Sequence, residues 1–241
     1  MQTASVVGLS DGWSIPECPI CKQERKEQQA REHAERAARM EEERKKRAIE
    51  NRLGRADIPP RFAEKRFDAF RPKTAEEERA LLACREYARD FRERLSIGQC
   101  MILCGVPGTG KTHLACAVLN EVAVNASANA LYLSFAKAIR SVKQTYSRES
   151  SITEQEAIDA LVKPDLLVLD EVGVQFGSDA EKMIGFEIIN SRYEAMKPTI
   201  IVSNLSGKQL IECLGDRVVD RLRENGGKML MFTGESRRGA A

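Results

Sequence analysis

In ILCGVPGTGKTHLA, residues 102–115, a short apolar run leads into a glycine-rich loop and then a helix-forming segment. Residues 105–112 match the pattern G-x-x-x-x-G-K-[ST] and stand between a predicted strand and a predicted helix, the context that this motif requires. The sequence therefore predicts a phosphate-binding loop built from backbone N–H groups, with the positive end of a helix behind it.

The predicted nucleotide contacts come from one continuous segment. Lys111 is expected to reach the outer phosphates, and the Thr112 hydroxyl is expected to ligate Mg²⁺. The residues of this segment are Gly105, Val106, Pro107, Gly108, Thr109, Gly110, Lys111, Thr112 and His113.

Two further apolar runs end in polar side chains. DLLVLDE, residues 165–171, ends in adjacent carboxylates, as expected for a buried parallel strand that delivers acids to the carboxyl edge of a sheet. Asp170 is predicted to hold Mg²⁺ directly or through water, and Glu171 to orient and polarise the attacking water. The run TIIVSN ends at Asn204, which is either a contact to the γ-phosphate or the lytic water, or an ordinary turn residue.

Apolar runs alternate with amphipathic segments along the second part of the chain. Because strand follows helix in regular alternation, we expect an α/β fold with a largely parallel sheet covered on both faces. Residues 75–95 are predicted to form one helix. The predicted strands are residues 101–103, 130–133, 166–169, 199–202 and 229–232.

A helical segment, residues 207–224, carries Arg217 and Arg221 four positions apart. A guanidinium presented by one subunit to the nucleotide of the next would stabilise transition-state charge. The alternative is an ordinary surface helix whose arginines pair with Asp216, Asp220 and Glu224.

The N-terminal part differs in composition. Residues 22–53 lack glycine and proline and hold 11 basic and 8 acidic side chains, which predicts a long solvated helix, either a spacer or an arm that docks on a partner. Two consecutive prolines at 59–60 favour a boundary here, giving an N-terminal region over residues 1–57 and a second domain over 58–241.

Cys18 and Cys21 form a C-x-x-C pair of the kind found in zinc knuckles. Since His33 is the only other candidate ligand in this region, a complete Zn²⁺ site within one chain is not expected, and a second chain or a partner would have to supply the remaining ligands.

The overall composition gives no general case for nucleic-acid binding. Of 241 residues, 42% are hydrophobic, and 38 basic side chains face 36 acidic ones, for a net charge of +2. Any DNA contact must therefore come from a local patch. Without a long apolar segment or a signal-peptide pattern, the expectation is a cytoplasmic protein with no membrane contact and with reduced cysteines.

The order of these motifs resembles that of AAA+ ATPases, and more closely that of DnaC-type helicase loaders and the related IstB transposition ATPases. The resemblance covers about 180 residues and is carried by IPPRFAEKRFDAF, GVPGTGKTHLACAV, DLLVLDEVGVQFGSD, SNLSGKQLIECLGDRVVDRL and ENGGKMLMF. It implies a three-layer P-loop ATPase without a C-terminal helical lid, since only nine residues follow Phe232.

The resemblance also implies partners and roles. The N-terminal region would bind a hexameric replicative helicase of a bacterium or phage, and slow ATP hydrolysis would help place that helicase on single-stranded DNA. Subunits would assemble through the helix that carries the arginine finger, with Arg221 favoured and Arg217 as its partner. The DNA-facing positions would be Lys143, Tyr146, Arg148 and Ser178, although Tyr146 could equally be a packing residue at a helix end.

Two other functions remain open at the level of sequence. The same ATPase could assist a DNA transposase, as IstB proteins do, although the cysteine pair and charged helix argue against this. Alternatively, the chain could be an adaptor in which bound ATP holds a shape without being hydrolysed.

Overall fold

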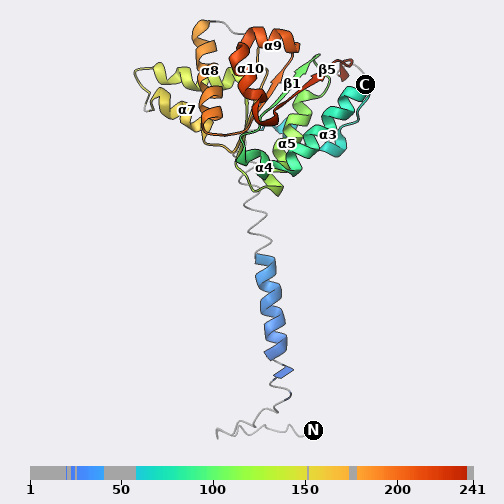
Figure 1. The fold of residues 1–241 in the computed structure, drawn as a ribbon. Coiled ribbons are helices and arrows are strands. Elements are labelled where there is room, and N and C mark those ends of the chain that lie inside the picture. Colours follow the sequence, from blue (N-terminus) through green and yellow to red (C-terminus); the bar gives the residue numbers. More distant parts are fainter. Residues whose placement is uncertain are drawn as a thin grey trace, which may run out of the picture. The chain divides into compact units, whose positions relative to one another are not determined.

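The computed structural model describes residues 20, 23–24, 26–40, 58–150, 152–173 and 178–237 (Figure 1). Contacts divide the chain into two units, residues 1–47 and residues 48–241. The domain boundary predicted at residue 57 lies outside the described residues and stays a prediction.

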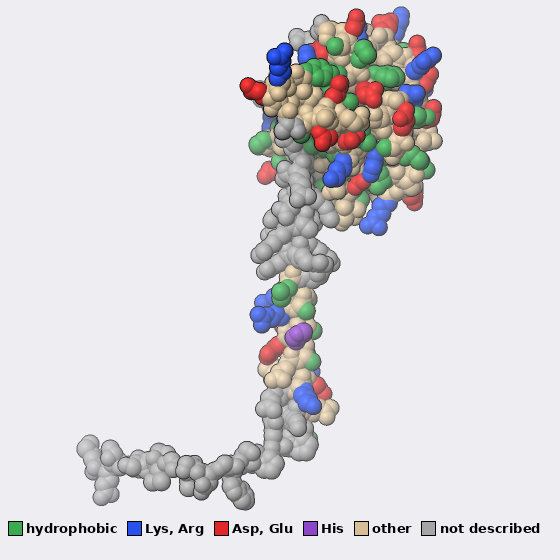
Figure 2. All heavy atoms as spheres, turned by 90° about the vertical axis from the view of Figure 1, so that its left-hand side faces the viewer, with side chains coloured by type: hydrophobic (Ala, Val, Ile, Leu, Met, Phe, Trp, Pro, Cys, Tyr) green, Lys and Arg blue, Asp and Glu red, His purple; other side chains and the backbone are tan. Residues whose placement is uncertain are grey.

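In the N-terminal unit, residues 26–40 form a continuous α-helix in which every residue is exposed. Side-chain amides of Gln23 and Gln28 donate to Glu27 and Glu32, four positions on, at 3.3 and 3.0 Å. Figure 2 shows charges of both signs on this helix. The predicted solvated helix is confirmed over these residues, and the rest of the predicted range is outside the described part of the chain.

The second unit is built on a five-stranded parallel sheet. Its strands are β1 (Met101–Gly105), β2 (Ala130–Ser134), β3 (Leu166–Asp170), β4 (Thr199–Ser203) and β5 (Lys228–Phe232). The strand order is β2-β3-β4-β1-β5, and every pairing is parallel. The central strands β1, β3 and β4 are buried along their whole length, which is why they read as unbroken apolar runs.

Helices cover both faces of this sheet, giving three layers (Figure 1). α3 (Ala75–Arg89) and α5 (Lys111–Asn125) pack with one apolar cluster, and the short α2 (Pro60–Ala63) lies against α5. The opposite face packs against α6 (Phe135–Lys143), α7 (Glu154–Val162), α8 (Asp179–Glu194), α9 (Gly207–Leu214) and α10 (Asp216–Arg223). The remaining short elements are α4 (Phe91–Ser96), η1 (Phe67–Ala69), η2 (Gln144–Tyr146) and η3 (Glu224–Gly226). The predicted α/β fold with a covered parallel sheet is confirmed.

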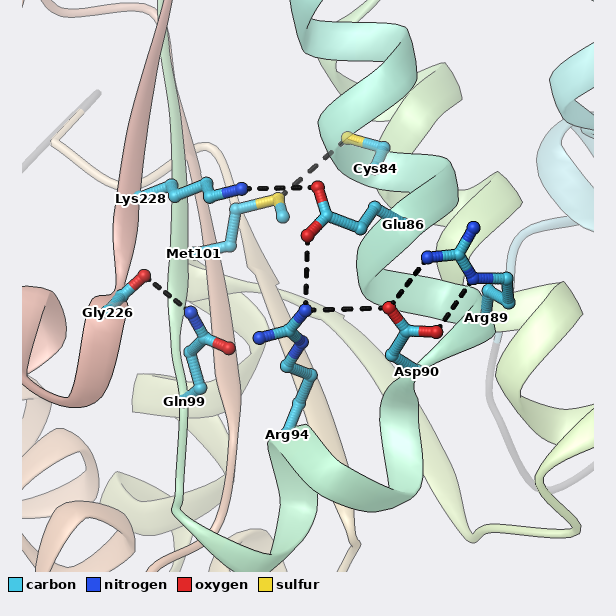
Figure 3. Close-up of polar contacts among 9 residues, drawn as sticks. All are labelled: Cys84, Glu86, Arg89, Asp90, Arg94, Gln99, Met101, Gly226 and Lys228. Carbon is cyan, nitrogen blue, oxygen red and sulfur yellow. Dashed lines mark hydrogen bonds and ion pairs between the residues drawn. The ribbon is translucent and has the colours of Figure 1, made fainter.

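The single helix predicted over residues 75–95 is wrong in one respect, because it is broken at Asp90 into α3 and α4. The bend brings the Arg94 guanidinium within 3.2 Å of Glu86 and 3.6 Å of Asp90 (Figure 3). Glu86 also pairs with Lys228, the first residue of β5, at 3.4 Å. These contacts join α3 and α4 to the amino end of the sheet. They cannot be predicted from the helical spacing of apolar residues.

The helical segment predicted over residues 207–224 is likewise two helices, α9 and α10, separated at Gly215. Gly215 has φ 84° and ψ 148°, a backbone conformation that glycine adopts without strain. Arg217 and Arg221 both lie on α10, so their predicted spacing on one helix is retained.

Candidate nucleotide-binding site

The glycine-rich loop connects the carboxyl end of β1 to the first turn of α5. Gly105, Gly108 and Gly110 all have positive φ, at 123°, 82° and 98°. A Cβ at Gly105 would collide with the carbonyl oxygen of Phe232, and one at Gly110 with the Phe70 ring. Glycine is therefore required both by the left-handed backbone and by the close approach of neighbouring segments.

Lys111 lies inside this loop, with its residue only 3% exposed. Its amine donates to the backbone oxygens of Gly105 and Val106 at 2.9 and 2.7 Å. The Thr109 hydroxyl donates to the Val106 oxygen at 2.8 Å. The loop thus folds around the buried Lys111 amine at the N-terminus of α5. A positive charge beside a helix N-terminus favours the binding of an anion.

The remaining loop residues differ in exposure. Val106 and Pro107 are exposed, whereas Thr112 and His113 are half-buried. The Nε2 of His113 lies 2.9 Å from the Arg66 carbonyl oxygen, and the imidazole packs on Phe70 with ring centroids 5.6 Å apart. Burial lowers the pKa of His113, which favours the neutral ring that donates Nε2–H to this carbonyl. His113 therefore ties α5 to the segment before α3.

Asp170 ends β3 at the same edge of the sheet and is 4% exposed. Its Oδ2 accepts a hydrogen bond from the Tyr132 hydroxyl at 2.6 Å, and its Oδ1 accepts one from the Glu171 N–H at 2.7 Å. Tyr132 was not among the predicted site residues. Tyr132 could be predicted as a site residue from its hydroxyl group only if β2 were known to pair with β3, and the strand order is not evident from the sequence.

Glu171 is exposed and has φ 60°, in the left-handed region that non-glycine residues rarely adopt. The next residue is anchored, because the Val172 N–H donates to Val202 at 3.0 Å and the Ser203 hydroxyl donates to the Val172 oxygen at 2.6 Å. Strained backbone held in place by its neighbours is typical of functional positions. Asn204 follows β4 at this edge, between the ends of β3 and β1, and is exposed.

Residues 233–237, the C-terminal strap, contact the glycine-rich loop, and no pattern in the sequence predicts this contact. The Arg237 N–H donates to the Gly108 carbonyl at 2.9 Å. The Arg237 guanidinium lies 4.4 Å from the centroid of the Phe70 ring and pairs with Glu77, which is 1% exposed. The strap and Phe70 thus brace the loop.

The two candidate arginine-finger residues have different surroundings. Arg217 is exposed, whereas Arg221 is half-buried against α8. The Arg221 guanidinium contacts the Asn190 side-chain oxygen and lies 5.9 and 5.2 Å from the rings of Phe186 and Tyr193. Within the described residues, neither arginine forms an ion pair with Asp216, Asp220 or Glu224.

The predicted DNA-contact residues gather near α6, α7 and the start of α8. Tyr146 is 56% exposed, and its hydroxyl donates to Glu154 at 2.7 Å, which raises the pKa of Tyr146. Lys143 pairs with Glu181 at 3.1 Å. Arg148 is exposed, and Ser178 caps α8 by accepting the Glu181 N–H. Figure 2 shows acidic and basic side chains interspersed on the face of this unit that it displays.

The sequence predicts a candidate zinc knuckle at Cys18 and Cys21 and reduced cysteines in the rest of the chain. Cys18 and Cys21 lie outside the described residues, and the described residues contain no group of three or more His, Cys, Asp or Glu side chains that could hold a metal ion. Cys84, Cys100, Cys104, Cys116 and Cys213 are all free thiols.

This donor set fits a triphosphate with Mg²⁺. The loop offers backbone N–H groups, a helix N-terminus and a buried lysine amine for phosphate oxygens. Each Asp170 oxygen accepts one hydrogen bond from the chain and keeps lone pairs for a cation or its water ligands.

Known proteins of similar sequence show the family of this chain. The sequence profile of a family described as IstB-like ATP binding protein matches residues 25–239. The chain belongs to the IstB-like ATP-binding family. Two proteins of similar sequence are both named replicative helicase loader DnaC. The protein from Buchnera aphidicola subsp. Acyrthosiphon pisum is 34% identical over 186 residues, 77% of this chain and 74% of the relative. The protein from Escherichia coli K12 is 31% identical over 190 residues, 79% of this chain and 76% of the relative.

Solved structures place this IstB-like ATP-binding chain in the AAA+ fold. A crystal structure of the DnaC helicase loader superposes with a TM-score of 0.65 at 26% identity, covering 73% of this chain and 100% of that chain. A crystal structure of DnaI superposes with a TM-score of 0.61 at 21% identity, covering 76% and 95%, and shows likeness of fold alone. The predicted resemblance to DnaC-type and IstB-type ATPases is confirmed.

Among the described residues, no helix combines the length and apolar character that crossing a bilayer demands.

Proposed function

We propose that this chain is an ATPase that binds a hexameric replicative helicase and helps place it on single-stranded DNA in the bacterial cytoplasm, whether a bacterium or its phage encodes it. Residues 1–57 would bind the helicase, and residues 58–241 would form the ATPase. The observation that carries the proposal is that the Lys111 loop and the Asp170–Glu171 pair end at one edge of one sheet, in a chain whose relatives are named helicase loaders.

The side chains at this edge supply the roles that phosphoryl transfer requires. Lys111 and the loop N–H groups would bind the phosphates, Thr112 and Asp170 would hold Mg²⁺, and Glu171 would orient the attacking water. Asn204 is placed to contact the γ-phosphate or that water. Magnesium, when bound, neutralises charge that develops on the phosphate oxygens.

Self-assembly would bring α10 of one subunit to the nucleotide of the next. Arg221 would be the finger, with the exposed Arg217 as its partner; to reach the neighbouring nucleotide, the Arg221 guanidinium would have to leave Asn190 and the two aromatic rings of α8. A stacking contact of Tyr146 with a DNA base would be supported by Lys143, Arg148 and Ser178. Because Glu154 and Glu181 occupy the polar groups of Tyr146 and Lys143, DNA must compete with two carboxylates.

Phosphate release, measured with and without single-stranded DNA and a replicative helicase, tests the proposal. We expect slow release that rises on addition of DNA or on assembly. Glu171→Gln should retain ATP but release no phosphate, because the amide cannot polarise water. Hydrolysis that is unchanged in Glu171→Gln would contradict the role of this residue. Magnesium-dependent ATP binding without any release in the parent would instead favour the adaptor that holds ATP unhydrolysed.

The partner is tested separately. The matching family is described as IstB-like, and assistance of a DNA transposase, as by IstB proteins, is the alternative to helicase loading. Pull-down of the full chain with a purified replicative helicase, and in parallel with a transposase of the IstB-dependent kind, separates the two candidates. Retention of the helicase and loss of that retention on deletion of residues 1–57 is the expected result. Retention of the transposase alone would replace helicase loading with transposition.

Zinc binding by Cys18 and Cys21, with ligands from a second chain or a partner, also stays a prediction. Metal analysis of the full chain, alone and in complex with the helicase, tests it, and less than about half a zinc per chain in both samples would exclude the site.

A further inference from the structure

Tyr132 reaches Asp170 across the pairing of β2 and β3. In this register Ser134 lies opposite Asp170, so Tyr132 starts two residues back along the neighbouring strand and its ring extends toward the carboxyl edge. Both side chains lie on the face covered by α5, the helix that begins at Lys111. The hydroxyl oxygen is 2.6 Å from Asp170 Oδ2, and the two residues are 6% and 4% exposed. This is a buried, short and charge-assisted hydrogen bond.

The direction of this hydrogen bond is fixed. A carboxylate oxygen accepts and has no proton to give, so the Tyr132 hydroxyl is the donor. With Oδ2 held by Tyr132 and Oδ1 held by the Glu171 N–H at 2.7 Å, the carboxylate has one orientation. Because the side chain is already held in this orientation, it loses little conformational entropy when a cation binds.

The ring of Tyr132 is itself held by the segment that precedes α3. Phe62 of α2 packs on it, with ring centroids 6.3 Å apart and a tilt of 44°. The Asn120 amide of α5 fixes the end of α2 by donating to the Ala63 and Lys65 oxygens at 3.1 and 3.0 Å.

We propose that Tyr132 is a positioning residue for Asp170, which sets the affinity of the site for Mg²⁺ in complex with ATP, and that Phe62 keeps Tyr132 in place for this purpose. The inference rests on the proposed nucleotide site and adds to it two residues that the loop and the carboxylate pair do not include. Partners that orient a metal-binding carboxylate are worth roughly 10–100-fold in metal affinity.

The test compares Tyr132→Phe with Tyr87→Phe in the full chain. Tyr87 is a matched control, because it is also buried, at 3% exposed, and its hydroxyl donates at 2.7 Å to the Gln99 carbonyl at the opposite end of the sheet. Each variant loses one buried phenol hydroxyl and keeps its ring. Three quantities are measured for each: urea unfolding without metal, ATP affinity in EDTA, and the Mg²⁺ concentration that gives half-maximal strengthening of ATP binding.

We expect Tyr132→Phe to raise the half-maximal Mg²⁺ concentration about tenfold with ATP affinity in EDTA unchanged. Tyr87→Phe should lower stability by a similar amount and leave the Mg²⁺ response as in the parent. Phe62→Leu, which keeps the hydroxyl but loosens the ring, should raise the half-maximal Mg²⁺ concentration by about threefold, a fraction of the full effect, and this variant decides the matter if Tyr132→Phe does not fold.

An unchanged Mg²⁺ response in both Tyr132→Phe and Phe62→Leu, or an equal shift in Tyr87→Phe, would overturn the inference and leave the proposed function standing. A parent protein that binds no Mg²⁺–ATP would overturn both.

Discussion

The two ends of the same parallel sheet are built in opposite ways. At the amino end, Arg192 is fully buried and donates to five acceptors, namely the Thr199 hydroxyl and the backbone oxygens of Leu161, Val162, Pro164 and Pro198, at 2.6 to 3.0 Å. At the carboxyl end, by contrast, Lys111 and Asp170 are buried beside the glycine-rich loop, each Asp170 oxygen accepts one hydrogen bond, and Glu171 adopts a left-handed backbone.

This difference shows how one sheet separates stability from chemistry. Each end of the sheet has a buried tyrosine hydroxyl. Tyr87 donates to the backbone carbonyl of Gln99 at the amino end, whereas Tyr132 donates to the carboxylate of Asp170 at the carboxyl end. Substitutions at the amino end should therefore change the free energy of unfolding, and those at the carboxyl end should change ligand binding.

The largest expected effect is that of Arg192→Met. It removes the charged donor that five acceptors share, and we expect a loss of roughly 3–5 kcal/mol in the free energy of unfolding, measured by urea titration. ATP affinity of the folded protein should not change. Arg89→Met, at an exposed ion pair with Asp90, is the control and should cost less than about 1 kcal/mol. A loss of that same size in Arg192→Met would remove the proposed role of the amino end.

Lys111→Ala is expected to weaken Mg²⁺–ATP binding on the order of 100-fold by calorimetry, because a charged donor to phosphate is lost. Lys228→Ala is the matched control, since this lysine begins β5 at the amino end and pairs with Glu86 in solvent. Its affinity for Mg²⁺–ATP should equal that of the parent. Equal affinity in Lys111→Ala and the parent would refute the nucleotide site.

Glu171→Gly separates strain from chemistry at one position. Because glycine adopts φ 60° without steric cost, we expect a gain of roughly 0.5–1 kcal/mol in stability together with loss of phosphate release. Glu171→Gln keeps the strain, so its stability should match the parent. A glycine variant less stable than the glutamine variant would show that the backbone here stores no strain.

The smallest effect concerns pH. Since burial lowers the pKa of His113 in the folded state, the unfolded chain binds more protons at low pH, and stability falls as pH drops below the ordinary value of about 6.5. Because the ring is half-exposed, we expect only a few tenths of a kcal/mol between pH 7.5 and 5.5. His113→Gln should remove this dependence in urea titrations at the two pH values, and an identical slope in both proteins would contradict it.

The strands, the glycine-rich loop after β1 and the two adjacent carboxylates at the end of β3 are predictable from the sequence alone, because each depends on neighbouring residues: an apolar run, a glycine spacing and two consecutive acids. The three-dimensional fold was needed to show that Tyr132 donates to Asp170, that Arg237 contacts Gly108, that Arg221 packs against α8 and that the helix predicted over residues 75–95 breaks at Asp90. Most of these contacts join residues that are distant in the chain. They depend on which strands and helices lie side by side and in which register. The pattern of neighbouring residues in the sequence does not show either of these.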